Sequence, residues 1–341
     1  MNYLKKHVKH IVIFLILICF TFYFVFRGQS IKEIFIIISK CNIYFLLIAF
    51  IIMFMFYAIQ AYNVKSLLKV LGQKVSYLKM LKFTLIEFFF SAITPASTGG
   101  QPIEIFYMAK DKIPVSKSTL SLLIQICSYQ LGVLLFSIFG AIYKPAFLNG
   151  VVKYFYIYGV IINLLVIVTM YVCIFSKKIA TKAVNLLIKF GNRFHIKAIT
   201  NKKDDIFKSL EKYEEGSKFI KKHKFEFVKS IIRGLFQITC HYIVTYFIYR
   251  ALGFNEIGFI EITAAQAIFY AASGCVPLPG SIGANEMLFL LIHKFTFGPD
   301  HVRPAMLLNL GVTFYIFVVI SFVIVLINTI KLSNKKEKKH G

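Results

Sequence analysis

The chain has 341 residues, 58% of them hydrophobic, and its mean hydropathy is +0.71. Soluble domains are about 45–50% apolar, so this composition excludes an ordinary soluble enzyme and predicts one integral membrane domain over residues 1–330. The net charge of +25 does not indicate a nucleic-acid partner, because the 40 Lys and Arg residues gather between the apolar runs and form no single basic face.

Six apolar runs are long enough to cross a bilayer as helices. They cover residues 11–26, 43–60, 119–143, 153–175, 231–250 and 304–330. The first run follows three lysines, but no small-residue cleavage site comes after it. We therefore interpret it as an uncleaved span and not as a signal peptide.

Two further apolar segments, 83–108 and 259–293, are interrupted by Pro and Gly at their centres. Each interruption removes backbone hydrogen bonds that a continuous membrane helix needs. We predict that both segments are re-entrant helical hairpins, which enter and leave on the same side of the membrane. The fold class expected is therefore all-α and polytopic, with about six full spans plus two hairpins.

The distribution of Lys and Arg supports this topology. With the N-terminus inside and both hairpins re-entrant, 31 of the 40 Lys and Arg residues are cytoplasmic and eight are outside. The cytoplasmic pieces are 1–10, 61–82, 109–118, 176–230 and 331–341. If both hairpins crossed completely, the basic segment 176–230 would lie outside, against the positive-inside rule. Both termini are therefore expected in the cytoplasm, where the basic pieces, including the tail 331–341, can meet an anionic membrane surface.

The same map predicts an inverted-topology repeat. Residues 11–143 form one half and residues 153–330 the other, with the same order of parts in opposite orientation. Broken segments at corresponding positions of two such halves are typical of a binding site near the membrane midplane.

The two breaks share a pattern in which Pro precedes Glu by nine residues with glycines between them. Glycine permits the turn, and the second half-helix then begins near the midplane with free N–H groups that favour an anion such as a lipid phosphate. The candidate residues for binding a lipid phosphate or headgroup are Thr98, Gly99, Gly100, Glu104, Gly280, Ser281, Gly283 and Glu286.

The two glutamates at these breaks allow more than one interpretation. Glu104 and Glu286 can complement the helix dipole, or they can attract a cationic headgroup, bind a coupling proton or pair with a basic residue. Arg233, Gln237 and His241 lie four apart on one helix face. Arg233 is a candidate charge partner or a side chain that extends to the interface, and His241 is a packing residue or a proton relay.

Two more acidic residues lie at the starts of the broken segments. Glu87 and Glu261 begin or flank the inbound half-helices, where they are expected at the membrane interface. The six cysteines include no CxxC pair, and the sequence holds no HExxH, P-loop, GxGxxG or GxSxG motif. We expect no disulfide framework, no metal site, no cofactor and no catalytic residue.

The two broken motifs also resemble a known family. Thr98-Gly99-Gly100 with Glu104, and the run from Pro277 to Glu286, are similar to the signature of the flippase-like family, also called the lysylphosphatidylglycerol synthase transmembrane region. The resemblance covers about residues 10–330. It implies the membrane part of a multiple peptide resistance factor, which moves lysyl-phosphatidylglycerol to the outer leaflet and so confers resistance to cationic antimicrobial peptides.

Larger relatives in this family carry a soluble acyltransferase-like domain after the membrane part, and we expect this chain, which stops at Gly341, to lack it. The expected function is flippase-like movement of an aminoacylated or anionic phospholipid in the bacterial inner membrane. Two alternatives stay open: a phosphatidylglycerol lysyltransferase that uses lysyl-tRNA, and a secondary transporter of small solutes. The expected partners are the phospholipid substrate, a separate lipid-modifying enzyme or a second copy of the chain.

Overall fold

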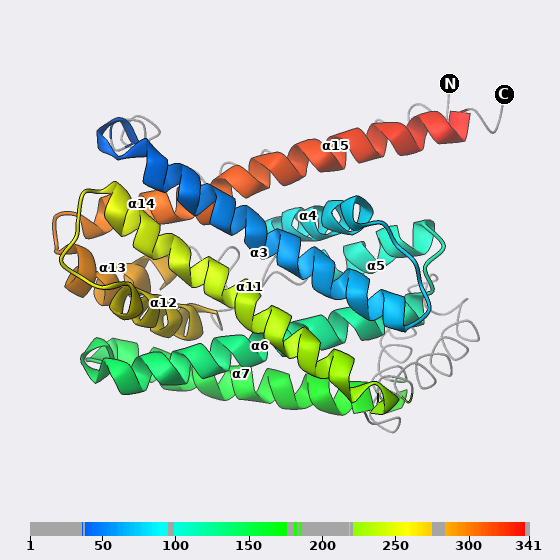
Figure 1. Cartoon of the computed structure of the whole chain (residues 1–341), viewed down its shortest axis with the longest axis horizontal. Coiled ribbons are helices and arrows are strands. Elements are labelled where there is room, and N and C mark those ends of the chain that lie inside the picture. Colours follow the sequence, from blue (N-terminus) through cyan, green and yellow to red (C-terminus); the bar gives the residue numbers. More distant parts are fainter. Residues whose placement is uncertain are drawn as a thin grey trace.

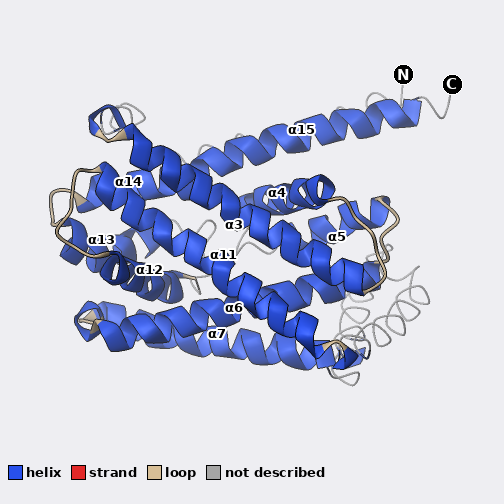
Figure 2. Cartoon of the chain, in the orientation of Figure 1, coloured by secondary structure: helices blue, strands red, loops and turns tan. Residues whose placement is uncertain are grey.

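The chain is an all-helical polytopic membrane protein. The computed structural model describes residues 38–94, 99–175, 221–274 and 284–337, together with positions 36, 181, 182, 185 and 218. Within these ranges every regular element is a helix (Figure 2). The predicted first span, 11–26, most of the basic segment 176–230 and the last four residues lie outside the described residues.

Five helices of the described part are long and apolar enough to cross a membrane. They are α3 (Ile43–Val70), α6 (Val115–Tyr143), α7 (Val151–Phe175), α11 (Lys224–Ala251) and the run Val302–Thr329. The last run comprises α14 (Val302–Leu310), the π-helix η4 (Gly311–Tyr315) and the first part of α15 (Ile316–Glu337). Five of the six predicted spans are thus confirmed as helices, and several extend beyond their apolar run because helix formation does not stop at the edge of the hydrocarbon.

Each broken segment forms two short helices. The first consists of α4 (Tyr77–Ile93) and α5 (Gly100–Lys110), and the second of α12 (Phe259–Ser273) and α13 (Ala284–Phe297). None has the roughly 20 residues that a crossing needs. Figure 1 shows α4 starting and α5 ending at one end of the bundle, whereas α12 starts and α13 ends at the other. The two hairpins therefore enter from opposite ends.

The two ends of the bundle differ in charge. We call the end formed by residues 69–79 and 110–117 the basic end, because it carries six lysines. The other end, formed by 144–150, 252–258 and 298–301, is the distal end. Glu261 lies at the distal end, where it forms an ion pair with Lys144 at 2.9 Å; its position at the membrane interface stays a prediction.

Thr94 links the two helices of the first hairpin. Thr94 precedes a proline and is extended (φ −110°, ψ 145°), which ends α4 at Ile93. Its hydroxyl donates to the Phe90 carbonyl at 2.7 Å and accepts from the Gly99 amide at 2.9 Å. The side chain thus joins the end of α4 to the start of α5.

Helices α6 and α11 cross closely because small residues line their contact. A Cβ atom at Gly234 would lie 2.6 Å from the Ser128 carbonyl oxygen, and one at Gly132 would lie 2.9 Å from Ile238. The hydroxyls of Ser128 and Ser230 are hydrogen-bonded at 2.9 Å across the same crossing. Small residues allow membrane helices to approach each other in this way.

The helix pairings follow a common pattern in the two predicted halves. α4 packs on α15 as α12 packs on α6, and the central pair α3 and α11 pack on each other. In each half the long helix before the hairpin also packs on the first hairpin helix. This correspondence supports the inverted repeat, which stays a prediction because the counterpart of α7 falls in the segment 11–26, outside the described residues.

Candidate functional site

A chain of buried amide side chains crosses the middle of the bundle. Gln125 of α6 donates to Gln237 of α11 at 3.1 Å, and Gln237 donates to Gln60 of α3 at 3.1 Å. Gln60 in turn donates to the Glu87 carboxylate of α4 at 3.5 Å. Four helices, from both predicted halves, thus contribute to one polar network in the interior.

Glu87 is the acceptor at the end of this chain. It is 8% exposed and lies ten residues, about 15 Å, along α4 from the first residue of that helix. Its carboxylate also accepts from the Ser91 hydroxyl at 2.7 Å and from the Gln101 amide of α5 at 3.4 Å. Glu87 was predicted at the membrane interface; the structure buries it among α3, α4 and α5, because α4 begins at Tyr77, ten residues before it.

The start of α5 lies directly against this carboxylate. Gly100 is buried, and a Cβ atom there would lie 2.7 Å from the Glu87 backbone oxygen, so the close approach of α5 to α4 requires glycine. Gly99 and Gly100 were both predicted as site residues. Their small size allows α5 to approach α4 closely. Gly99 in addition donates its amide to Thr94.

Glu104 lies one helical turn beyond Gly100 on the same face of α5. It is 1% exposed, its Oε1 atom has no hydrogen-bond partner, and it interacts electrostatically with Glu87. Glu104, a predicted site residue, thus lies in the interior beside Glu87. The site thus contains two buried carboxylates, and in the described ranges neither of them forms an ion pair with a Lys or Arg side chain.

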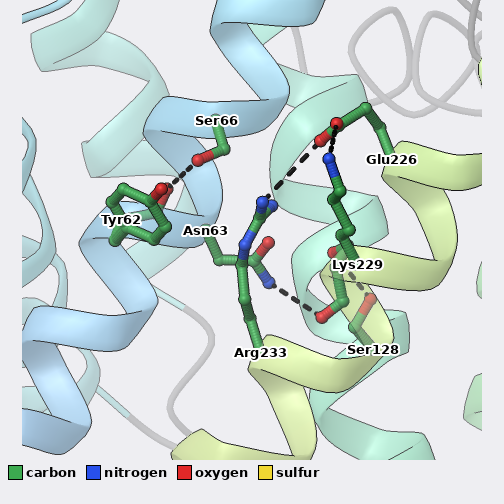
Figure 3. Close-up of polar contacts among 8 residues, drawn as sticks. Tyr62, Asn63, Ser66, Ser128, Glu226, Lys229 and Arg233 are labelled. Carbon is green, nitrogen blue, oxygen red and sulfur yellow. Dashed lines mark hydrogen bonds and ion pairs between the residues drawn. The ribbon is translucent and has the colours of Figure 1, made fainter.

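Arg233 does not supply the missing positive charge. Figure 3 shows it extending from α11 toward Glu226, with Nη2 3.7 Å from Oε2. Its guanidinium also lies over the Tyr62 ring at 5.3 Å, and Lys229 contacts the same Glu226 at 2.8 Å. The Cβ direction of a helix points a long side chain toward the N-terminus, here toward the basic end. Arg233 therefore follows the interfacial alternative and is not the partner of Glu104 or Glu286.

A group of aromatic side chains joins α3, α6 and α11 to α12 of the second hairpin. The hydroxyl of Tyr129 on α6 donates to that of Tyr270 on α12 at 2.7 Å. His241 packs on Tyr270 with ring centroids 4.9 Å apart and on Phe56 at 5.6 Å. His241 is thus surrounded by rings, which fits the packing alternative. Tyr57 of α3 interacts electrostatically with both Glu87 and Tyr270, so it adjoins both parts of the centre.

The second hairpin contributes Glu286 in the first turn of α13. Glu286 is partly exposed and interacts electrostatically with Tyr315, the last residue of the π-helix η4. A π-helical turn within a longer helix is frequent at functional sites. Four other predicted site residues, Thr98, Gly280, Ser281 and Gly283, lie outside the described residues.

Sequence reasoning did not assign several members of the site, including Gln60, Glu87 and Gln101. Gln60, Glu87 and Gln101 each lie within an apolar run or broken segment, and a polar residue at membrane depth is itself a signal of function. Gln237, which was predicted, joins the site through Gln60 and Gln125. Over the ranges that the structure describes, no group of three or more His, Cys, Asp or Glu side chains could hold a metal ion.

Comparisons with known proteins extend over both hairpins. A family model described as "Lysylphosphatidylglycerol synthase TM region" matches residues 10–321. The chain is also similar to a protein from Archaeoglobus fulgidus named "UPF0104 membrane protein", with 25% identity over 274 residues. That alignment covers 78% of this chain and 80% of the archaeal relative.

Proposed function

The chain belongs to the lysylphosphatidylglycerol synthase TM region family, and from this premise we propose that it moves a phospholipid with a cationic, aminoacylated headgroup between leaflets. Lysyl-phosphatidylglycerol is such a lipid, since it carries two ammonium groups and one phosphate. The headgroup would cross through the centre of the bundle while its acyl chains remain in the bilayer.

The observation that carries this proposal is the charge of the site. Glu87 and Glu104 lie together in the interior, and within the described residues no Lys or Arg side chain forms an ion pair with either of them. Buried ionised groups require a partner of opposite charge. A lysyl ammonium can supply it, whereas an anionic headgroup such as unmodified phosphatidylglycerol would be repelled. The site therefore favours ammonium recognition at the first hairpin, in place of the phosphate recognition that its glycines alone predicted.

The arrangement of the hairpins supports a route across the membrane. The first hairpin enters from the basic end and the second from the distal end. Tyr270, in the last turn of α12, receives a hydrogen bond from Tyr129 of α6. Two opposed hairpins around one central site resemble transporters in which two repeats move against each other. Each hairpin would then control access from its own side.

The basic end would face the cytoplasm under the positive-inside rule. In a bacterial inner membrane this orientation lets the first hairpin receive a lipid made at the cytoplasmic leaflet. Delivery of a cationic lipid to the outer leaflet would lower the negative charge of the cell surface and reduce the binding of cationic antimicrobial peptides.

A leaflet-exchange assay tests the proposal. The full chain is reconstituted into liposomes that contain acyl-labelled lysyl-phosphatidylglycerol, phosphatidylglycerol or phosphatidylethanolamine, and the outer-leaflet dye is bleached with dithionite. We expect the inner-leaflet lysyl lipid to become accessible faster than in protein-free liposomes. Glu104→Gln should slow this exchange about tenfold, equivalent to about 1.4 kcal/mol, because half of the carboxylate pair is lost.

The exposed Glu256 at the distal end provides a matched control. Glu256→Gln removes one carboxylate from the same protein but should leave exchange unchanged. Equal exchange of all three headgroups, or undiminished exchange in Glu104→Gln, would contradict the proposal. A deletion strain that loses total lysyl lipid, with no change in its leaflet distribution, would instead indicate the lysyltransferase alternative.

A further inference from the structure

The two carboxylates of the site have different surroundings. Glu87 accepts hydrogen bonds from one hydroxyl and two amides, the groups of Ser91, Gln60 and Gln101. Such donors stabilise the ionised form of a carboxylate. Glu104 has a buried Oε1 atom without a partner, and an ionised carboxylate in that position would be unfavourable. The hydrogen bonds therefore assign the negative charge to Glu87.

Other charged or titratable groups near the pair are few. Tyr57 of α3 interacts electrostatically with Glu87. On the hairpin itself, Lys82 and Lys110 lie nearer the basic end, in the first part of α4 and at the end of α5. Helices α6 and α15 also pack on the first hairpin. Residues 118–143 of α6 and 316–329 of α15 include no charged side chain. Two like charges in so apolar a place cannot both persist without a compensating ion.

We propose that the Glu87–Glu104 pair holds one proton while the site is empty and releases it to water when a primary ammonium group binds between the two carboxylates. Glu104 is the proton carrier, and Glu87 stays ionised throughout. The ammonium replaces the proton one for one, so the net charge of the occupied site equals that of the empty site. This inference rests on the proposed function for its ligand, the lysyl headgroup.

Proton release can be measured directly on the full chain in detergent. Lysyl-phosphatidylglycerol in mixed micelles is added to the protein in a weakly buffered solution with a pH indicator, and phosphatidylglycerol micelles serve as the blank. We expect about one proton per chain at saturation with the lysyl lipid, because one of the paired carboxylic acids must ionise. Glu104→Gln should abolish the release, whereas Glu256→Gln should preserve it.

A second measurement on the unaltered chain needs no variant. If binding releases one proton, the Kd for the lysyl lipid should fall about tenfold for each unit of rising pH while the empty site remains protonated. Binding of the lysyl lipid without proton release and with a Kd independent of pH would overturn the inference. Undiminished release in Glu104→Gln would also overturn it.

One further measurement distinguishes a lipid-borne ammonium group from a soluble one. Lysine ethyl ester carries the same ammonium groups without acyl chains. Proton release with the lysyl lipid alone supports both the inference and lipid transport. Release with the soluble ester to the same extent supports ammonium capture by the pair but contradicts the proposed lipid function. Leaflet exchange of the lysyl lipid at a rate independent of pH, with no proton release, leaves lipid movement intact and overturns the inference.

Discussion

Gly100 lies so close to Glu87 that a Cβ atom at position 100 would be 2.5 Å from the carboxylate Oε1. Real Cβ contacts are essentially never that short. Gly100, the first residue of α5, therefore packs directly against the Glu87 carboxylate, which accepts a hydrogen bond from Gln60. The first hairpin and the charge site depend on the same approach of α4 to α5.

Gly100→Ala should separate α5 from α4 and disrupt the site. We expect a loss of about 1–3 kcal/mol in the free energy of unfolding, as for other overpacked positions, together with slower lipid exchange. Thermal unfolding followed by size-exclusion chromatography measures the first effect. Gly258→Ala is the control, since a Cβ atom there meets nothing within 4 Å. Equal stability of the two variants would argue against the close contact.

Thr94→Val should loosen the turn of the first hairpin. Valine keeps the shape of threonine but loses the hydroxyl that joins Phe90 to Gly99, at a cost of about 1 kcal/mol. Thr94→Ser retains the hydroxyl and should stay close to the parent. Limited proteolysis near the turn and thermal unfolding can compare the two. A Ser variant as unstable as the Val variant would show that the methyl group matters more than the hydrogen bonds.

Tyr129 and Tyr270 should behave as an energetically coupled pair. Their hydroxyls join α6 to α12 at 2.7 Å, so replacing either with Phe should cost about 1 kcal/mol. The double variant should cost less than the sum of the two single changes, because the second change removes a bond already lost. A double-mutant cycle by thermal unfolding tests this, with Tyr154→Phe on the exposed face of α7 as the control. Strict additivity would contradict the direct bond.

Arg233 should matter little for the choice of headgroup. Because its ion pair is with Glu226 and is partly exposed, Arg233→Gln should change stability by about 1 kcal/mol or less. The preference for lysyl-phosphatidylglycerol over phosphatidylglycerol should persist in the leaflet-exchange assay, in contrast to Glu104→Gln. Loss of that preference in Arg233→Gln would mean that the residue acts at the carboxylate site after all.

Several features could be predicted from the sequence because they depend on local chemistry. Apolar runs of sufficient length predicted the crossing helices, and Pro and Gly at the centres of 83–108 and 259–293 predicted the two hairpins. The short connections at 71–76 and 111–114 place the start of α4 beside the end of α3 and the end of α5 beside the start of α6. Glu104 was identified because a carboxylate is costly at membrane depth wherever it points.

The membership of the site required the tertiary structure. Whether Glu87 is interfacial or central depends on the residue at which α4 begins and on which face of α4 carries Glu87. The apolar run around Glu87 determines neither of these. The partners of Gln60 and Gln237 lie on other helices, far away in sequence. The sequence by itself thus determined which segments enter the membrane, since local hydrophobicity and backbone hydrogen bonding control that. Packing alone decided which polar groups meet there, because the rotation and depth of each helix are set by its neighbours.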